Sequence, residues 1–243
     1  MFESLQQLWI GPDGRGLSLL MGLASTVQIA LGAYALGLTI GLFSALGKIH
    51  GGPILRWTLE IYTTLIRAVP ELVLILLLYY AGTAALNNAL VSLGMRPVDI
   101  SGLVAGIVVL GVVQGAYSTE VIRAAMQAVP RGQTEAALAY GMSRAQSIRR
   151  ILIPAMIPFA IPGLANLWLI VTKDTALLAV VGFFELATAT KAAAGSTRDY
   201  LTFYLAAAVL YLCLTLVSNR IFVFLERRYR RGQAGANAAG PGI

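Results

Sequence analysis

The chain has 243 residues, of which 58% are hydrophobic and 12% charged. An ordinary soluble domain carries roughly 25% charged residues, so the composition excludes that class and indicates a membrane protein. The formal net charge of +7 would suit nucleic acid or anionic lipid, but in a membrane protein the position of the charges matters more than their sum. The single cysteine, Cys213, and the single histidine, His50, leave no intrachain disulfide and no zinc-like Cys/His spacing.

Apolar stretches of membrane-spanning length run along most of the chain. A helix needs about 20 residues to cross the hydrocarbon layer of about 30 Å, and two shorter apolar stretches, residues 86–95 and 177–186, are expected to form re-entrant or interfacial helices. We therefore predict an all-α membrane protein with five transmembrane helices. These helices are expected at residues 19–47, 59–82, 100–121, 151–171 and 200–225.

The placement of lysine and arginine predicts how the chain is oriented in the membrane. With the N-terminus outside, thirteen of the 18 basic residues would lie in inner segments and five in outer segments. This asymmetry predicts a periplasmic N-terminus and a cytoplasmic C-terminus, and it accounts for most of the positive charge without nucleic acid. The predicted parts are a polar periplasmic segment without a cleavable signal peptide (1–18), a transmembrane domain (19–226) and a basic, disordered cytoplasmic tail (227–243).

A polar, arginine-rich loop separates the third and fourth predicted spans. Its sequence, TEAALAYGMSRAQSIRRILIPAMIP (residues 134–158), predicts two short helices. Glu135 lies near the positive end of the first helix dipole, and Gly141 can supply the left-handed residue that ends this helix. Ser143 and Gln146 have the spacing of a capping box at the start of the second. The loop is therefore expected to form a compact cytoplasmic knob.

Three interpretations of the knob are open. It could be a solvated loop, a helix-turn-helix that binds DNA, or a docking element for a cytoplasmic partner. The flanking spans argue against DNA binding. The chain has no G-x-x-x-x-G-K-[ST] loop for nucleotide phosphates, and it lacks H-E-x-x-H and G-x-S-x-G. Energy for active transport would have to come from another subunit, which favours docking.

The spacing within the knob resembles the EAA loop of ABC importer permeases. In that family the loop is the coupling helix, which lies in a groove of the ATPase subunit, and Ile153 is the one departure because the family usually has leucine there. The stretches EIYTTLIRAVPELVLILLLYY and VSNRIFVFLERRYRRG are also similar to polar amino-acid permeases of the histidine, lysine/arginine/ornithine and octopine/nopaline type. The positions that match the loop motif are Glu135, Ala136, Ala137, Gly141, Ile151 and Pro154.

The resemblance implies a type I ABC importer fold in a bacterial inner membrane, with the coupling loop at about residues 130–154. It implies that the chain is the first of two permease subunits and translocates a polar, more narrowly a basic, amino acid or an opine. The implied partners are two copies of a cytoplasmic ATPase, a second homologous permease or a second copy of this chain, a periplasmic amino-acid-binding protein and membrane lipids, with no nucleic acid. ATP and Mg²⁺ would be bound by the ATPase, and this chain would bind no cofactor or metal.

Charged residues inside a span are costly and usually face protein or a cavity. Arg67 and Glu71 lie four residues apart around Pro70, which predicts an internal ion pair. Alternatively, Glu71 would meet the cationic end of a substrate, as its resemblance to the basic amino-acid and opine branch suggests. Glu120 and Arg123, three residues apart, are expected to form a structural ion pair.

Other polar residues are candidates for the substrate path. Gln114 and Tyr117 lie one turn apart in the third span, where they would line the path or bond to a neighbouring helix. The fourth span carries three prolines at four-residue intervals, which favour the broken helices that transporters place near substrate. The family resemblance places Asp174 and Thr175 beside the path, although Asp174 could instead pair with Lys173.

Other functions are compatible with part of the sequence. A permease for glutamine or glutamate would share the same loop. A passive channel would explain the spans and prolines but leaves the loop pattern without a role. The sequence contains no nucleophile–base set that would support a membrane-embedded hydrolase. Exporters of the same superfamily generally lack the loop pattern.

Overall fold

The computed structural model describes residues 8–9 and 14–230. Most of the predicted N-terminal segment before residue 14, and the tail beyond residue 230, lie outside the described residues. The described part is helical, and residues 227–230 of the predicted tail belong to its last helix. In chain order the elements are α2 (Gly16–His50), α3 (Pro53–Ala68), α4 (Glu71–Ser92), α5 (Gly102–Ala128), α6 (Arg131–Ala139), α7 (Arg144–Ser147), the π-helical turn η1 (Ile148–Leu152), α8 (Ile153–Asp174), the 3₁₀ turn η2 (Thr175–Val180), α9 (Leu186–Thr197) and α10 (Tyr200–Arg230).

Five segments of the described chain are long and apolar enough to cross a membrane. Four of them overlap the predicted spans closely, and α7 to η2 form one of them without interruption. The prediction of an all-helical chain with five candidate spans is confirmed. The five segments are Gly16–His50, Glu71–Ser92, Gly102–Ala128, Arg144–Val180 and Tyr200–Tyr229.

The second predicted span, residues 59–82, is wrong as a single helix. The chain leaves the helical conformation at Val69, whose φ and ψ are −99° and 139°. A residue before proline is disfavoured in the α region, and proline lacks the N–H that would continue the helix. The apolar run therefore divides between α3 and α4. Helix α4 continues through most of residues 86–95, which were expected to form a separate short helix.

The second short stretch, residues 177–186, also differs from its prediction. It contains no helix of its own: the 3₁₀ turn η2 ends at Val180, the chain turns at Gly182 with φ of 89°, and α9 begins at Leu186. Only glycine adopts a positive φ freely, so Gly182 separates the two elements. Residues 177–180 of this stretch belong to the candidate span Arg144–Val180, and residues 181–186 follow it.

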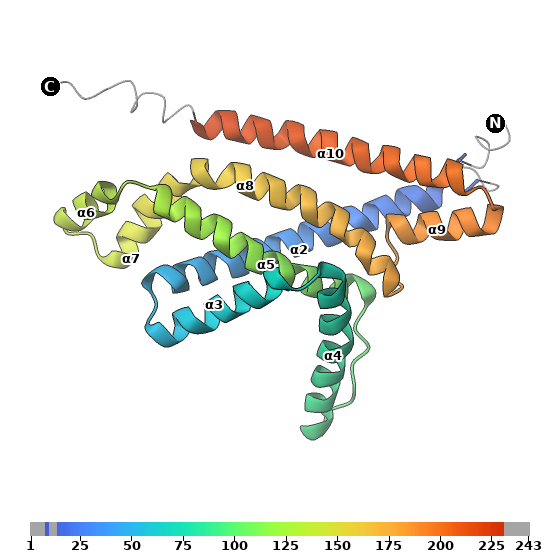
Figure 1. Ribbon diagram of the computed structural model, residues 1–243, viewed down its shortest axis with the longest axis horizontal. Helices are drawn as coiled ribbons and strands as arrows, with labels where there is room; N and C mark the ends of the chain where they lie inside the picture. The colour runs from blue at the N-terminus through green and yellow to red at the C-terminus, as the bar shows by residue number, and fades with distance from the viewer. Residues whose placement is uncertain (1–7, 10–13, 231–243) are drawn as a thin grey trace.

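Helices α2, α5, α8 and α10 run roughly lengthwise and form the body of the molecule (Figure 1). Helices α6 and α7 lie at one end of this body, and α9 lies at the opposite end, near the start of α2. Helix α4 projects away from the body at a large angle, and little of its apolar surface is buried.

The contact between α2 and α5 depends on small residues in α2. A Cβ atom added to Gly41 would lie 2.5 Å from the Cβ of Ser118, and one added to Gly37 would lie 2.7 Å from the Cγ of Gln114. Small residues let membrane helices approach closely, and packing of this kind drives their association in lipid. The glycines of α2 therefore set the spacing of the central helix pair.

We expect Gly41→Ala to destabilise the protein by about 1–3 kcal/mol, because the added methyl group overpacks this contact. Gly82→Ala is the matched control, since a Cβ there has open space around it. The midpoint of thermal unfolding of the purified protein in detergent should fall for Gly41→Ala and not for Gly82→Ala. Equal midpoints for the two variants would contradict a tight α2–α5 contact at Gly41.

Candidate coupling loop and membrane-embedded polar site

The first helix of the knob, α6, follows Pro130 and ends at a left-handed glycine. Gly141 has φ of 83°, its N–H donates to the carbonyl of Leu138 at 2.9 Å, and the N–H of Met142 donates to the carbonyl of Ala137 at 3.1 Å. These bonds satisfy carbonyl groups that the end of a helix would otherwise leave free. The turn that the sequence predicts at Gly141 is present, and its backbone requires glycine.

The second helix of the knob begins with the predicted capping box. The N–H of Gln146 donates to Oγ of Ser143 at 3.3 Å, and the N–H of Ser143 donates to Oε1 of Gln146 at 2.9 Å. Helix α7 then continues through the π turn η1 into α8. Pro154 is the second residue of α8, directly after the π turn, and the helical path continues through it.

The knob exposes both charged and apolar side chains. Glu135, Ala136, Gly141 and Pro154 are exposed, Ile151 is half-buried, and Ala137 packs inward against the rest of the knob. Two residues that sequence reasoning did not single out stand beside them: Leu138 is 45% exposed and Tyr140 is 89% exposed. Large apolar side chains exposed on a polar projection are typical of a protein-binding surface.

Within the helical body, three of the five substrate-path candidates come together. Glu71 is the first residue of α4, Tyr117 lies in α5, and Asp174 is the last residue of α8. Glu71 interacts electrostatically with both Tyr117 and Asp174, and all three are half-buried. Lys173 is exposed and also interacts electrostatically with Asp174. The break before α4 therefore brings two carboxyl groups from separate helices to one site.

The other two candidates are buried in helix contacts. Gln114 is 3% exposed and packs against Gly37 of α2, with no hydrogen-bond partner for Nε2. Thr175 is fully buried, and its hydroxyl donates to the carbonyl of Thr172 at 2.9 Å. The structure thus does not bring Gln114 and Thr175 into the electrostatic group formed by Glu71, Tyr117 and Asp174.

The predicted ion pair between Arg67 and Glu71 is not formed. Nε of Arg67 donates to the carbonyl of Thr63 at 3.1 Å instead. The helix break at Val69 and Pro70 removes the regular four-residue spacing that would place the two side chains on one face. Arg67 therefore belongs to α3, and Glu71 to the site at the start of α4.

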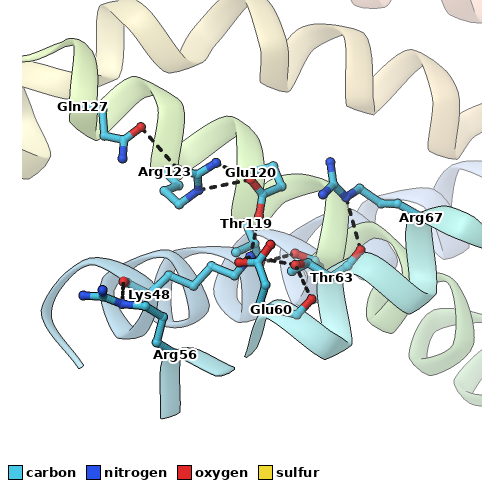
Figure 2. A network of polar contacts seen from close by, with 10 residues as sticks. Lys48, Arg56, Glu60, Thr63, Arg67, Thr119, Glu120, Arg123 and Gln127 are labelled. Atoms are coloured by element: carbon cyan, nitrogen blue, oxygen red, sulfur yellow. Dashed lines mark hydrogen bonds and ion pairs between the residues drawn. The ribbon is translucent and has the colours of Figure 1, made fainter. Parts of the chain in front are cut away.

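Glu120 and Arg123 do form an ion pair, at 2.7 Å between Oε2 and Nη2. This pair belongs to a larger network centred on Lys48 (Figure 2). Lys48 is not among the site residues predicted from the sequence. The partners of Lys48 come from α3 and α5, so no local spacing in the sequence could have found them.

Membrane-length helices, a structured polar projection and charged groups between the helices define the molecule as a multi-pass membrane protein. The chain belongs to the family described as binding-protein-dependent transport system inner membrane component, whose model matches residues 37–231. It is an inner-membrane permease component of an ABC transporter, and it is not the ATPase. Membership of the family implies an ATPase and a binding protein as partners.

The relatives of the chain agree with this assignment. The chain is 42% identical over 214 residues to the histidine/lysine/arginine/ornithine transport system permease protein HisQ of Escherichia coli (strain K12), covering 88% of this chain and 94% of HisQ. It is 37% identical over 228 residues to the octopine transport system permease protein OccQ of Rhizobium radiobacter, covering 93% and 96%. The resemblance to polar amino-acid permeases is confirmed.

A solved structure has the same fold. It is the crystal structure of an amino acid ABC transporter with histidines, which superposes with a TM-score of 0.73 at 32% sequence identity and covers 88% of this chain and 94% of that one. The similarity extends over nearly the whole described body, so the arrangement of helices is that of amino-acid ABC transporter permeases.

Proposed function

We propose that the chain translocates a basic amino acid or an opine across the inner membrane, driven by ATP hydrolysis on a separate subunit. This substrate class is supported by the interaction between Glu71, at the start of α4, and Asp174, at the end of α8. Two half-buried carboxylates repel each other more strongly than they would in water. An ammonium or guanidinium group between them would relieve this repulsion. The names of HisQ and OccQ point to substrates of the same kind.

We also propose that residues 130–154 are the coupling loop that binds the ATPase. The exposed turn after α6, with Leu138 and Tyr140 beside Glu135 and Ala136, supports this role. The ATPase, in two copies, would bind ATP and Mg²⁺, and this chain would pair with a second homologous permease or a second copy of itself. The motif positions Gly141, Ile151 and Pro154 would hold the shape of the loop rather than contact nucleotide.

The proposed orientation places the N-terminus in the periplasm and the C-terminus in the cytoplasm. It is supported by the bias of lysine and arginine toward the segments on the side of the knob. It also agrees with the arrangement of the helices, because α6, α7 and the C-terminal end of α10 lie toward one end of the molecule and α9 toward the other (Figure 1). The binding protein would then approach the end that carries α9.

The substrate class is tested by reconstituting the full complex with its ATPase and binding protein in liposomes. Arginine, lysine, histidine, ornithine or an opine should stimulate ATP hydrolysis, and uptake should require ATP. Stimulation by glutamine or glutamate alone would contradict a cationic substrate. Uptake that continues without ATP would instead support a passive channel.

A further inference from the structure

Lys48 is the centre of a polar network that the proposed function does not yet use. Its side chain is 3% exposed, and Nζ lies 2.7 Å from Oγ1 of Thr63, from Oε2 of Glu60 and from Oε1 of Glu120 (Figure 2). A lysine ammonium has three N–H donors, so each donor has one acceptor. Lys48 thereby joins three helices, because it belongs to α2, its first two acceptors to α3 and its third to α5.

On the α5 side, the network continues toward the knob. Oε2 of Glu120 accepts from Nε of Arg123 at 3.0 Å and from Nη2 at 2.7 Å, and Nη1 of Arg123 donates to Gln127 at 3.3 Å. Helix α5 ends one residue later, and only Val129 and Pro130 separate it from α6. A displacement of the coupling loop therefore acts directly on the part of α5 that holds Glu120.

On the α3 side, the network leads toward the carboxylate site. Helix α3 ends at Ala68, and Glu71 follows after a two-residue break. This helix has little other attachment to the body, because only Thr63 and Ile66 are buried along its length. Besides Lys48, the side-chain hydrogen bonds that join α3 to other helices among the described residues are Arg56 Nε to the carbonyl of Lys48 at 3.0 Å and Tyr62 Oη to the carbonyl of Val112 at 2.6 Å.

We propose that Lys48 is a positioning residue that transmits displacement of the coupling loop from α5 to α3, and so to Glu71. The proposal rests on the proposed function, since it assumes that the knob is moved by an ATPase. A buried charge that loses its partner is strongly destabilised, so the ammonium keeps Glu120 and the α3 acceptors together when α5 moves. Helix α3, with few apolar contacts of its own, follows.

The proposal is tested by removing the α3 acceptors while leaving the Lys48–Glu120 pair intact. The variant is Glu60→Leu with Thr63→Val, and the matched control is Thr58→Val, an exposed threonine of α3 whose hydroxyl donates to the carbonyl of Ile54 in the same helix. The complete complex, with ATPase and binding protein, is reconstituted in liposomes. Arginine taken up and ATP hydrolysed are measured in the same sample, which gives the amount transported per ATP.

We expect the double variant to bind the ATPase and hydrolyse ATP at the wild-type rate, while arginine transported per ATP falls about tenfold, within the usual range of coupling between sites. The control should keep the wild-type ratio. A second variant, Lys48→Met with Glu120→Gln, removes both charges of this pair together. Glu60 and Arg123 then lose their ion-pair partners, but both side chains are partly exposed to solvent. This variant should lower the ratio in the same way.

A purely structural role for the network predicts a different result. Uptake and ATP hydrolysis would then fall together with the amount of folded complex, and the ratio would stay unchanged, which would overturn the proposal. If the wild-type complex showed no ATP-dependent arginine uptake, the proposed function itself would fail. If the wild type transports arginine and both double variants transport as much arginine per ATP as the wild type, only the proposed role of Lys48 is wrong.

Discussion

Gly141→Val is expected to abolish most of the association between the permease and its ATPase. The backbone at Gly141 has φ of 83°, a conformation that costs a residue with a side chain roughly 1–2 kcal/mol and a β-branched residue more. The turn would have to open, which displaces Leu138 and Tyr140 from their exposed positions. With about 1.4 kcal/mol for each factor of ten, we expect ATPase binding and uptake to fall about tenfold or more.

The control for this experiment is Gly195→Val. Both glycines have open space around the position of a Cβ atom, but Gly195 lies within helix α9 and has no left-handed backbone. The measurement is the amount of ATPase that co-purifies with a fixed amount of permease in detergent. Wild-type co-purification by Gly141→Val, together with wild-type uptake, would contradict a docking role for the knob.

The second large effect is expected from neutralising the carboxylate site. Asp174→Asn and Glu71→Gln should each lower arginine uptake about tenfold or more, because a hydrogen bond to a charged group contributes about 1.5–3 kcal/mol. Basal ATP hydrolysis should persist, since neither residue lies in the knob. Initial rates of arginine uptake into proteoliposomes, at several arginine concentrations, would measure the effect.

Asp99→Asn is the matched control for this pair of variants. Asp99 is exposed in the connection between α4 and α5, outside the carboxylate site, so its neutralisation should leave uptake unchanged. If Asp174→Asn and Glu71→Gln transport arginine as well as the control does, the two carboxylates do not meet the substrate cation. The proposed site would then be wrong, although the family assignment would stand.

The features that the sequence predicts best are local ones. The capping box of Ser143 and Gln146 and the turn at Gly141 follow from residue types a few positions apart, and both are present. Membrane-length apolar runs are equally local, so the spans at residues 100–121 and 200–225 correspond closely to α5 and α10. These features need no knowledge of which helices pack together.

The features that the sequence misses depend on tertiary structure. Apolarity continues through residues 59–82, so hydropathy could not locate the break at Pro70, although the proline itself is a signal. Lys48 and Glu120 are 72 positions apart, and only the packing of α2 against α5 brings them together. The same holds for Glu71 and Asp174, whose proximity depends on where α4 begins and α8 ends beside α5.

The central claim, that the knob at residues 130–154 binds the ATPase, is tested most directly by site-specific cross-linking. A single cysteine is introduced at Ala136 in the knob or at Gly195 in α9, both exposed, in a chain whose exposed Cys213 has been replaced by alanine. The assembled complex is then treated with a short cysteine-to-amine cross-linker. The account predicts that Ala136→Cys becomes linked to the ATPase and Gly195→Cys does not. A link from Gly195→Cys, or none from Ala136→Cys in a complex that still imports its substrate, would contradict it.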